Sequence, residues 1–124
     1  MTVREAMEQI DELHPNQFSQ AQKLRWLTEV EQTIWRELSM RHEQDEETEM
    51  PVYDDATSET VLLAPDPYSR IYRLYLDAQI YYNNQETLRY NDAAATYNAA
   101  WQELASWWNR TYMPRQQATY LRLM

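Results

Sequence analysis

The stretch IYRLYLDAQIYY, residues 71–82, places apolar or aromatic side chains at nearly every position of a helical period. A helix that is apolar nearly all round is buried on more than one side, and this segment therefore predicts such a helix. Asp66-Pro67 has the pattern of an N-cap followed by proline at the first helical position, which predicts the start. Asn83-Asn84 predicts the end, because asparagine can adopt the left-handed conformation that glycine usually supplies.

The next stretch, from residue 85 to about residue 112, predicts a long helix with one packing seam. The pairs Tyr90-Asn91 and Tyr97-Asn98 repeat within it after seven residues. Neighbouring residues lie about 100° apart on a helix, so the tyrosines are expected in the seam and the asparagines along a polar edge beside it. The seam positions alternate at spacings of four and three, as in a heptad repeat: Tyr90, Ala94, Tyr97, Trp101, Leu104 and Trp108.

Two further helices are predicted in the N-terminal part of the chain. Thr2 and Ser19 begin capping-box patterns ahead of segments at about 2–13 and 19–42. The second segment carries one apolar stripe at helical spacing, made of Leu27, Val30, Ile34 and Leu38.

These patterns predict an all-α fold. We expect a small four-helix bundle of two antiparallel helix pairs within residues 1–113. A long acidic loop, residues 43–66, separates the second and third helices, and residues 114–124 form an extended C-terminal tail. Within the loop, residues 52–53 and 61–63 have weak strand potential. The chain has no glycine, which excludes phosphate-cradling loops, and no cysteine, which excludes disulfides and thiolate metal sites.

The net charge of −9 is concentrated in one segment. Residues 42–67 hold nine acidic residues and no lysine or arginine, whereas the segments on either side are close to neutral. The spacing of these acids does not match a calcium-binding loop, and the chain has no Glu-x-x-His pair for a helical metal site. A solvated acidic loop is the preferred interpretation, and no metal or other cofactor is expected. The acids of interest are Asp45, Glu46, Glu47, Glu49, Asp54 and Asp55.

The sequence does not predict an enzyme. It has no cysteine nucleophile, no serine in a nucleophile elbow, and two histidines that are far apart in the sequence, His14 and His42. The N-terminus lacks the apolar core of a signal peptide, and no stretch approaches the 18 apolar residues that suggest a membrane span. The acidic composition also lacks the basic stripe typical of proteins that read DNA sequence.

The surplus of aromatic residues predicts contacts between copies of the chain. Five tryptophans and ten tyrosines are too many for a small bundle to bury, and exposed aromatic patches usually mark partner surfaces. Trp26 and Trp35 are expected outside the apolar stripe of their helix. Arginine is the preferred cation of interfaces. The residues expected to contact another subunit are Trp26, Trp35, Arg70, Arg73, Asn91, Asn98, Trp107 and Arg110.

Segments along nearly the whole chain resemble one protein family. In the N-terminal half these are residues 15–16, 23–27 and 29–31. In the C-terminal half they are residues 62–65, 67–68, 72, 75, 78–80, 82–83, 89–91, 97–98 and 107–111. Together they resemble the head–tail connector proteins, or adaptors, of the neck of tailed phages and of prophages of Gram-positive bacteria.

The resemblance implies a helical structural protein without catalytic activity. Such adaptors form a ring, usually of twelve subunits, beneath the portal protein. The ring extends the DNA channel, retains the packaged genome and carries the stopper or tail-completion protein. The expected partners are therefore the portal, the stopper or tail-completion protein, other copies of the chain, and double-stranded DNA that passes without sequence-specific binding. The location implied is the virion neck, after assembly in the bacterial cytoplasm.

Two further expectations follow if the chain is such an adaptor. The tail is basic and partly apolar, which suits a docking arm that becomes ordered on a partner, and Arg115, Tyr120, Leu121 and Arg122 are expected to anchor it on the portal. The acidic loop suits the wall or rim of the channel, because carboxylates repel DNA phosphates. The alternatives are an acidic helical interaction module, such as a DNA mimic or host-factor inhibitor, and a tail-completion ring protein.

Overall fold

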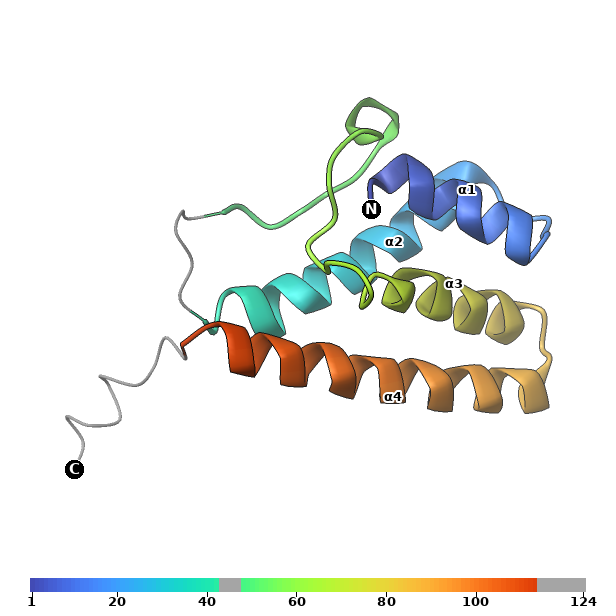
Figure 1. Cartoon of the computed structure of the whole chain (residues 1–124). Helices are drawn as coiled ribbons and strands as arrows, with labels where there is room; N and C mark the ends of the chain where they lie inside the picture. Colours follow the sequence, from blue (N-terminus) through green and yellow to red (C-terminus); the bar gives the residue numbers. More distant parts are fainter. Residues whose placement is uncertain (43–47, 114–124) are drawn as a thin grey trace.

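The computed structural model describes residues 1–42 and 48–113 (Figure 1). Within these ranges the fold is all helical, as the sequence predicts, and Thr2 and Val61 form an isolated β-bridge. Residues 52–53 and 61–63 form no strand. Four α-helices follow one another along the chain: α1 Val3–Leu13, α2 Gln20–Ile34, α3 Arg70–Asn83 and α4 Thr87–Thr111.

The first two helices begin where their capping patterns predict. At α1 the Thr2 hydroxyl accepts a hydrogen bond from the Glu5 N–H, and the Glu5 carboxylate accepts one from the Thr2 N–H, both at 3.2 Å. At α2 the Ser19 hydroxyl accepts a hydrogen bond from the Gln22 N–H at 3.1 Å. α2 continues directly into a π-helix, Trp35–Ser39. The continuous helical segment therefore ends close to the predicted boundary at about residue 42.

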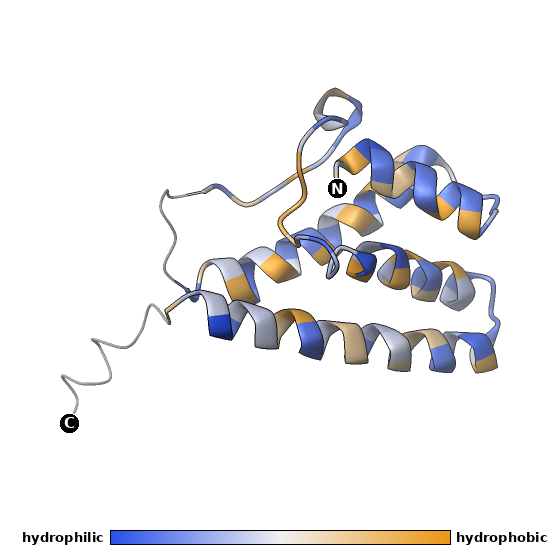
Figure 2. Ribbon diagram, viewed as in Figure 1, coloured by the Kyte–Doolittle hydropathy of each residue, from blue (hydrophilic) through white to orange (hydrophobic). Residues whose placement is uncertain are grey.

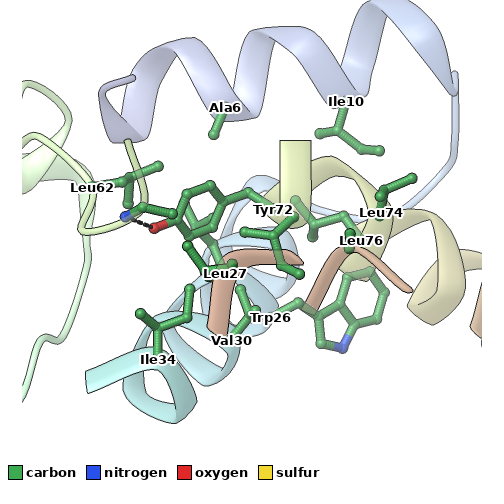
Figure 3. Packing of buried hydrophobic residues seen from close by; sticks show 14 of the residues in the cluster. Ala6, Ile10, Trp26, Leu27, Val30, Ile34, Leu62, Tyr72, Leu74 and Leu76 are labelled. Atoms are coloured by element: carbon green, nitrogen blue, oxygen red, sulfur yellow. Dashed lines mark hydrogen bonds between the residues drawn. The ribbon is translucent and has the colours of Figure 1, made fainter. Parts of the chain in front are cut away.

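The buried face of α2 is wider than its apolar stripe. Trp26 is only 5% exposed and lies in the core (Figure 3), so the prediction that it lies outside the stripe is wrong. The ring of Phe18, from the connection between α1 and α2, packs edge-on against Trp26 with centroids 5.1 Å apart. Because this connection covers the edge of α2, Trp26 belongs to the chain's own core and is not available to a neighbouring subunit.

α3 is the central helix and contacts α1, α2 and α4 (Figure 1). Its residues Ile71, Tyr72, Leu76 and Ile80 are fully buried (Figure 3 shows Tyr72 and Leu76), which confirms burial on more than one side. Strongly apolar positions recur along α1, α2 and α3, whereas much of α4 has intermediate hydropathy (Figure 2).

α4 runs antiparallel to α3 and packs against it along the predicted seam (Figure 1). The ring of Tyr97 contacts Tyr75, and that of Tyr90 contacts Tyr82, in each case with centroids 5.4 Å apart. The buried residues of α4 are Ala100, Leu104 and Trp108. The rest of this helix is half-buried or exposed.

Both predicted ends of α3 need correction. The Asp66–Pro67 bond is cis, and α3 begins only at Arg70. The Asp66 carboxylate accepts a hydrogen bond from the Ser69 hydroxyl, so it closes a separate turn and does not cap the helix. At the other end the left-handed residue is Gln85, with φ 60°, and not an asparagine. Asn83 is still helical and Asn84 has φ −88°, so the chain reverses one residue later than predicted.

Candidate functional site

Glu31 of α2 carries the most deeply buried carboxylate in the described part of the chain, and its residue is 0% exposed. One oxygen accepts a hydrogen bond from the Tyr72 hydroxyl of α3 at 2.6 Å. The other accepts hydrogen bonds from the Tyr53 hydroxyl at 2.7 Å and from the Leu63 N–H at 2.9 Å. Both Tyr53 and Leu63 belong to the connecting segment, which lies between the π-helix Trp35–Ser39 and α3, so one carboxylate joins two helices and this segment.

The Tyr72 hydroxyl extends this network by one step. It donates to Glu31 and accepts a hydrogen bond from the Ala64 N–H at 2.8 Å. Successive amides, those of Leu63 and Ala64, are therefore held by a side chain of α2 and a side chain of α3. We call these residues the Glu31 cluster: Glu31, Tyr53, Leu63, Ala64 and Tyr72. Within it, both oxygens of the carboxylate and the Tyr72 hydroxyl are hydrogen-bonded.

Burial controls the electrostatics of the Glu31 cluster. It raises the pKa of Glu31 above the usual value of a glutamic acid, against the opposing effect of its three hydrogen bonds. Burial, together with the Glu31 carboxylate, raises the pKa of Tyr72 well above its usual value and that of Tyr53 in the same direction. Both phenols therefore stay protonated and act as donors. The Glu31 carboxylate, fully buried and held by three donors, is not accessible to a substrate in this structure.

A second set of contacts fixes the same segment to the start of α1. The Leu62 N–H donates to the carbonyl of Met1 at 2.8 Å. The Val3 and Arg4 N–H groups, which the first turn of a helix leaves free, donate to the carbonyls of Thr60 and Ser58 at 3.0 and 2.8 Å. An ion pair between Arg4 and Glu59, at 2.8 Å and exposed to solvent, adds little to stability. The segment therefore supplies acceptors for α1 while its own amides bond to Glu31, Tyr72 and Met1.

The two histidines lie in separate places. His14 Nδ1 is 3.0 Å from Asp77 Oδ1, and Asp77 also accepts a hydrogen bond from Arg73 at 2.9 Å. His42 lies 2.6 Å from the Leu38 carbonyl and 2.7 Å from the side-chain oxygen of Asn109. Among the described residues, no group of three or more His, Cys, Asp or Glu side chains is arranged to hold a metal ion.

The predicted interface residues are distributed over several surfaces. Asn91, Asn98 and Arg110 are exposed on α4, whereas Trp107 is half-buried and its ring contacts those of Tyr68, Trp108 and Tyr112. Trp26 is buried in the core, and the other three side chains make contacts within the chain. Arg70 pairs with Glu103 at 2.7 Å, Arg73 bonds to Asp77, and the Trp35 indole N–H donates to the Thr48 hydroxyl at 2.9 Å.

Of the six predicted channel acids, Glu49, Asp54 and Asp55 are exposed. The Asp54 carboxylate accepts a hydrogen bond from the Ala56 N–H at 2.9 Å and caps the short 3-10 helix Asp55–Thr57. Asp54 and Asp55 share a hollow of about 220 Å³ with Glu8 and Asp11 of α1. Two groups of predicted site residues lie outside the described ranges: the acids Asp45, Glu46 and Glu47, and the tail anchors Arg115, Tyr120, Leu121 and Arg122.

The Glu31 cluster was not predicted from the sequence, although a signal for it is present. Glu31 lies four residues after Leu27 and three before Ile34, so it shares the face of the apolar stripe. A single carboxylate on an apolar face indicates a buried partner, because an unpaired charge in a core is costly. The identity of the three donors, two tyrosines and one loop amide, requires the tertiary structure.

Comparisons with protein-family models, with curated proteins and with solved structures found no match for this chain. None of the helices in the described ranges combines the length and the apolar character needed to cross a bilayer.

Replacement of Tyr72 by phenylalanine tests the Glu31 cluster. The Tyr72→Phe variant leaves the buried Ala64 N–H without its acceptor and removes one donor from Glu31. We expect a loss of about 2–4 kcal/mol in the free energy of unfolding, measured by urea denaturation. Tyr75→Phe on the same helix is the matched control. It removes a bond to the exposed Glu29 carboxylate and should cost about 1 kcal/mol or less. Equal losses in both variants would contradict the assignment.

The raised pKa of Glu31 predicts a specific pH dependence. The folded chain keeps a proton on Glu31 at a pH where the unfolded chain, with a pKa near 4.3, has lost it. The contribution of Glu31 to stability is therefore fully present below about pH 4 and falls as the pH rises through the folded pKa. The difference in unfolding free energy between the native chain and Glu31→Gln should decrease over this range. A difference that stays constant or grows would show that burial does not dominate.

Proposed function

We propose that this chain is a structural protein of the phage neck, a head–tail connector adaptor that forms a ring under the portal. The ring extends the DNA channel and joins the head to the stopper or tail. In this proposal the four helices form a small bundle and the acidic loop lies at the wall or rim of the channel. Residues 114–124 dock on the portal through the four tail anchors.

The observation that carries this proposal is the exposed length of α4. Only Ala100, Leu104 and Trp108 of its 25 residues are buried. α4 packs against α3 on one side, and the other side is exposed along the whole helix (Figure 1). A ring requires two different faces of each subunit to meet. A long helix at the edge of the molecule offers one such face, and it carries Asn91, Asn98 and Arg110 of the predicted interface.

The closed Glu31 cluster supports a role without catalysis. Its buried carboxylate has the environment that tunes catalytic acids, but no oxygen of it is accessible to a substrate. The nearby hydroxyls of Tyr53 and Tyr72 are used in the same network. The polar groups of the core therefore serve to hold the helices and the connecting segment together, which suits a subunit that transmits contacts between larger assemblies.

The position of the described acids suits a surface that faces DNA without binding it. Glu49, Asp54 and Asp55 lie on the connecting segment, and the Asp54–Asp55 turn lies next to α1 (Figure 1). Carboxylates on this side of each subunit of a ring would repel the phosphates of DNA in the channel.

One observation favours a second candidate, an acidic interaction module that mimics DNA or inhibits a host factor. Such a module needs carboxylates on an ordered surface, and the hollow between α1 and the connecting segment gathers Glu8, Asp11, Asp54 and Asp55. Asp11 is partly neutralised there by the buried Lys23, which reduces the resemblance to a row of phosphates. A tail-completion protein would also form a ring, but it would not bind the portal.

Mass measurement of the chain mixed with a portal ring tests the proposed function. We expect native mass spectrometry to show a portal complex that carries a ring of copies of this chain. Deletion of residues 114–124 should leave the helical fold intact by circular dichroism and abolish the complex, because the anchors are lost. Undiminished binding by the truncated chain would contradict the docking role, and absence of a ring on the portal would contradict the adaptor role.

A further inference from the structure

The outer face of α4 is exposed and has no charged side chain. The 25 residues of α4 span about 37 Å, and a quarter of the chain is charged. Depletion of charge is what distinguishes the centre of a protein–protein interface from other surface. The outer face comprises Leu88, Asn91, Ala95, Asn98, Ala99, Gln102 and Ser106.

Two opposite charges lie along one edge of the outer face. Asp92 and Arg110 are 18 residues apart, which is five helical turns, so they lie on the same edge near opposite ends of α4. Both are exposed. Among the described residues, the ion pairs made by α4 and its N-cap join Glu103 to Arg70 and Arg89 to Glu86. Asp92 and Arg110 take part in neither.

These positions make the face self-complementary in one orientation. When two copies of a helix pair antiparallel about a two-fold axis, each edge of the outer face lies next to the same edge of the second copy. With the axis at the level of Trp101, Asp92 of one copy lies opposite Arg110 of the second copy. The two-fold symmetry generates this pair twice. Ala95 then lies opposite Ser106 and Ala99 opposite Gln102, so small side chains allow the helices to approach. A parallel pair would instead leave Asp92 and Arg110 about 27 Å apart.

We propose that two copies of the free chain form an antiparallel dimer through the outer faces of α4, held at its edges by two Asp92–Arg110 ion pairs. The contact is isologous and closes after two copies. This inference goes beyond the proposed ring, since it concerns the chain before it meets any other protein. Ring formation would exchange this partner for a neighbouring subunit on the same face.

Introduced cysteines test the orientation, because the native chain has none. Gln102→Cys lies close to the two-fold axis and should form a disulfide-linked dimer under mild oxidation. Ala95→Cys should not link to itself, because the two sulfurs would be about 18 Å apart. It should link to Ser106→Cys when the two variants are mixed. Self-linking of Ala95→Cys, or no linking of the mixed pair, would overturn the antiparallel arrangement.

Charge reversal tests the ion pairs. Asp92→Arg and Arg110→Asp should each weaken dimerisation about tenfold or more, because each places like charges opposite one another twice. An equimolar mixture of the two variants should restore the affinity as a heterodimer, since one copy supplies two arginines and the other two aspartates. Arg110 lies in the last turn of α4 and also suits the helix dipole, but a dipole effect would not be restored by mixing.

Sedimentation equilibrium gives the affinities, and native mass spectrometry identifies the heterodimer. Arg89→Asp, on another side of the same helix, is the matched control and should dimerise like the native chain. Circular dichroism confirms that each variant remains helical. A native chain that stays monomeric, or a mixture that associates no better than its components, would overturn the dimer. Neither result would affect the proposed ring, whose test is assembly on the portal.

Discussion

The described structure depends on one buried carboxylate, that of Glu31. Its two oxygens receive hydrogen bonds from Tyr72 of α3 and from Tyr53 and Leu63 of the connecting segment. Hydrogen bonds in a low-dielectric core are strong, and a donor left without its acceptor there is costly. The Tyr72 hydroxyl also holds the Ala64 amide. The carboxylate therefore fixes where the non-helical segment crosses the helices.

The hydrogen bonds of Glu31 also help to join three of the helices into one unit and leave α4 at its edge. The segment held at residues 63–64 is also bonded to Met1, Val3 and Arg4 at the start of α1, so α1, α2 and α3 form one supported unit. α4 joins this unit through α3 and keeps its outer face exposed. The polar groups of the Glu31 cluster are used within the fold, so the proposed function rests on other features: the acids near α1, the outer face of α4, and the terminal tail.

The sequence predicts the helices well because their signals are local. Capping residues and apolar spacing place α1, α2 and the seam of α4 within a few residues. The errors arise where tertiary contacts decide. Trp26 is buried because the α1–α2 connection covers the edge of α2, and Asp66 bonds to Ser69 where a helix cap was expected. The importance of Glu31 depends on partners that lie 22 to 41 residues away along the chain. Of the residues predicted to form the interface, those on α4 remain candidates and Trp26 does not.

Amide hydrogen exchange of Leu63 and Ala64 tests the central role of Glu31 most directly. Both residues lie outside helices, but if Glu31 holds this segment, their N–H groups become accessible to exchange only when the whole fold opens. They should therefore exchange as slowly as the amides of Leu76 and Ile80 in the middle of α3. Exchange of Leu63 and Ala64 at the rate of unprotected peptide amides would show that the segment opens independently, and would contradict the account.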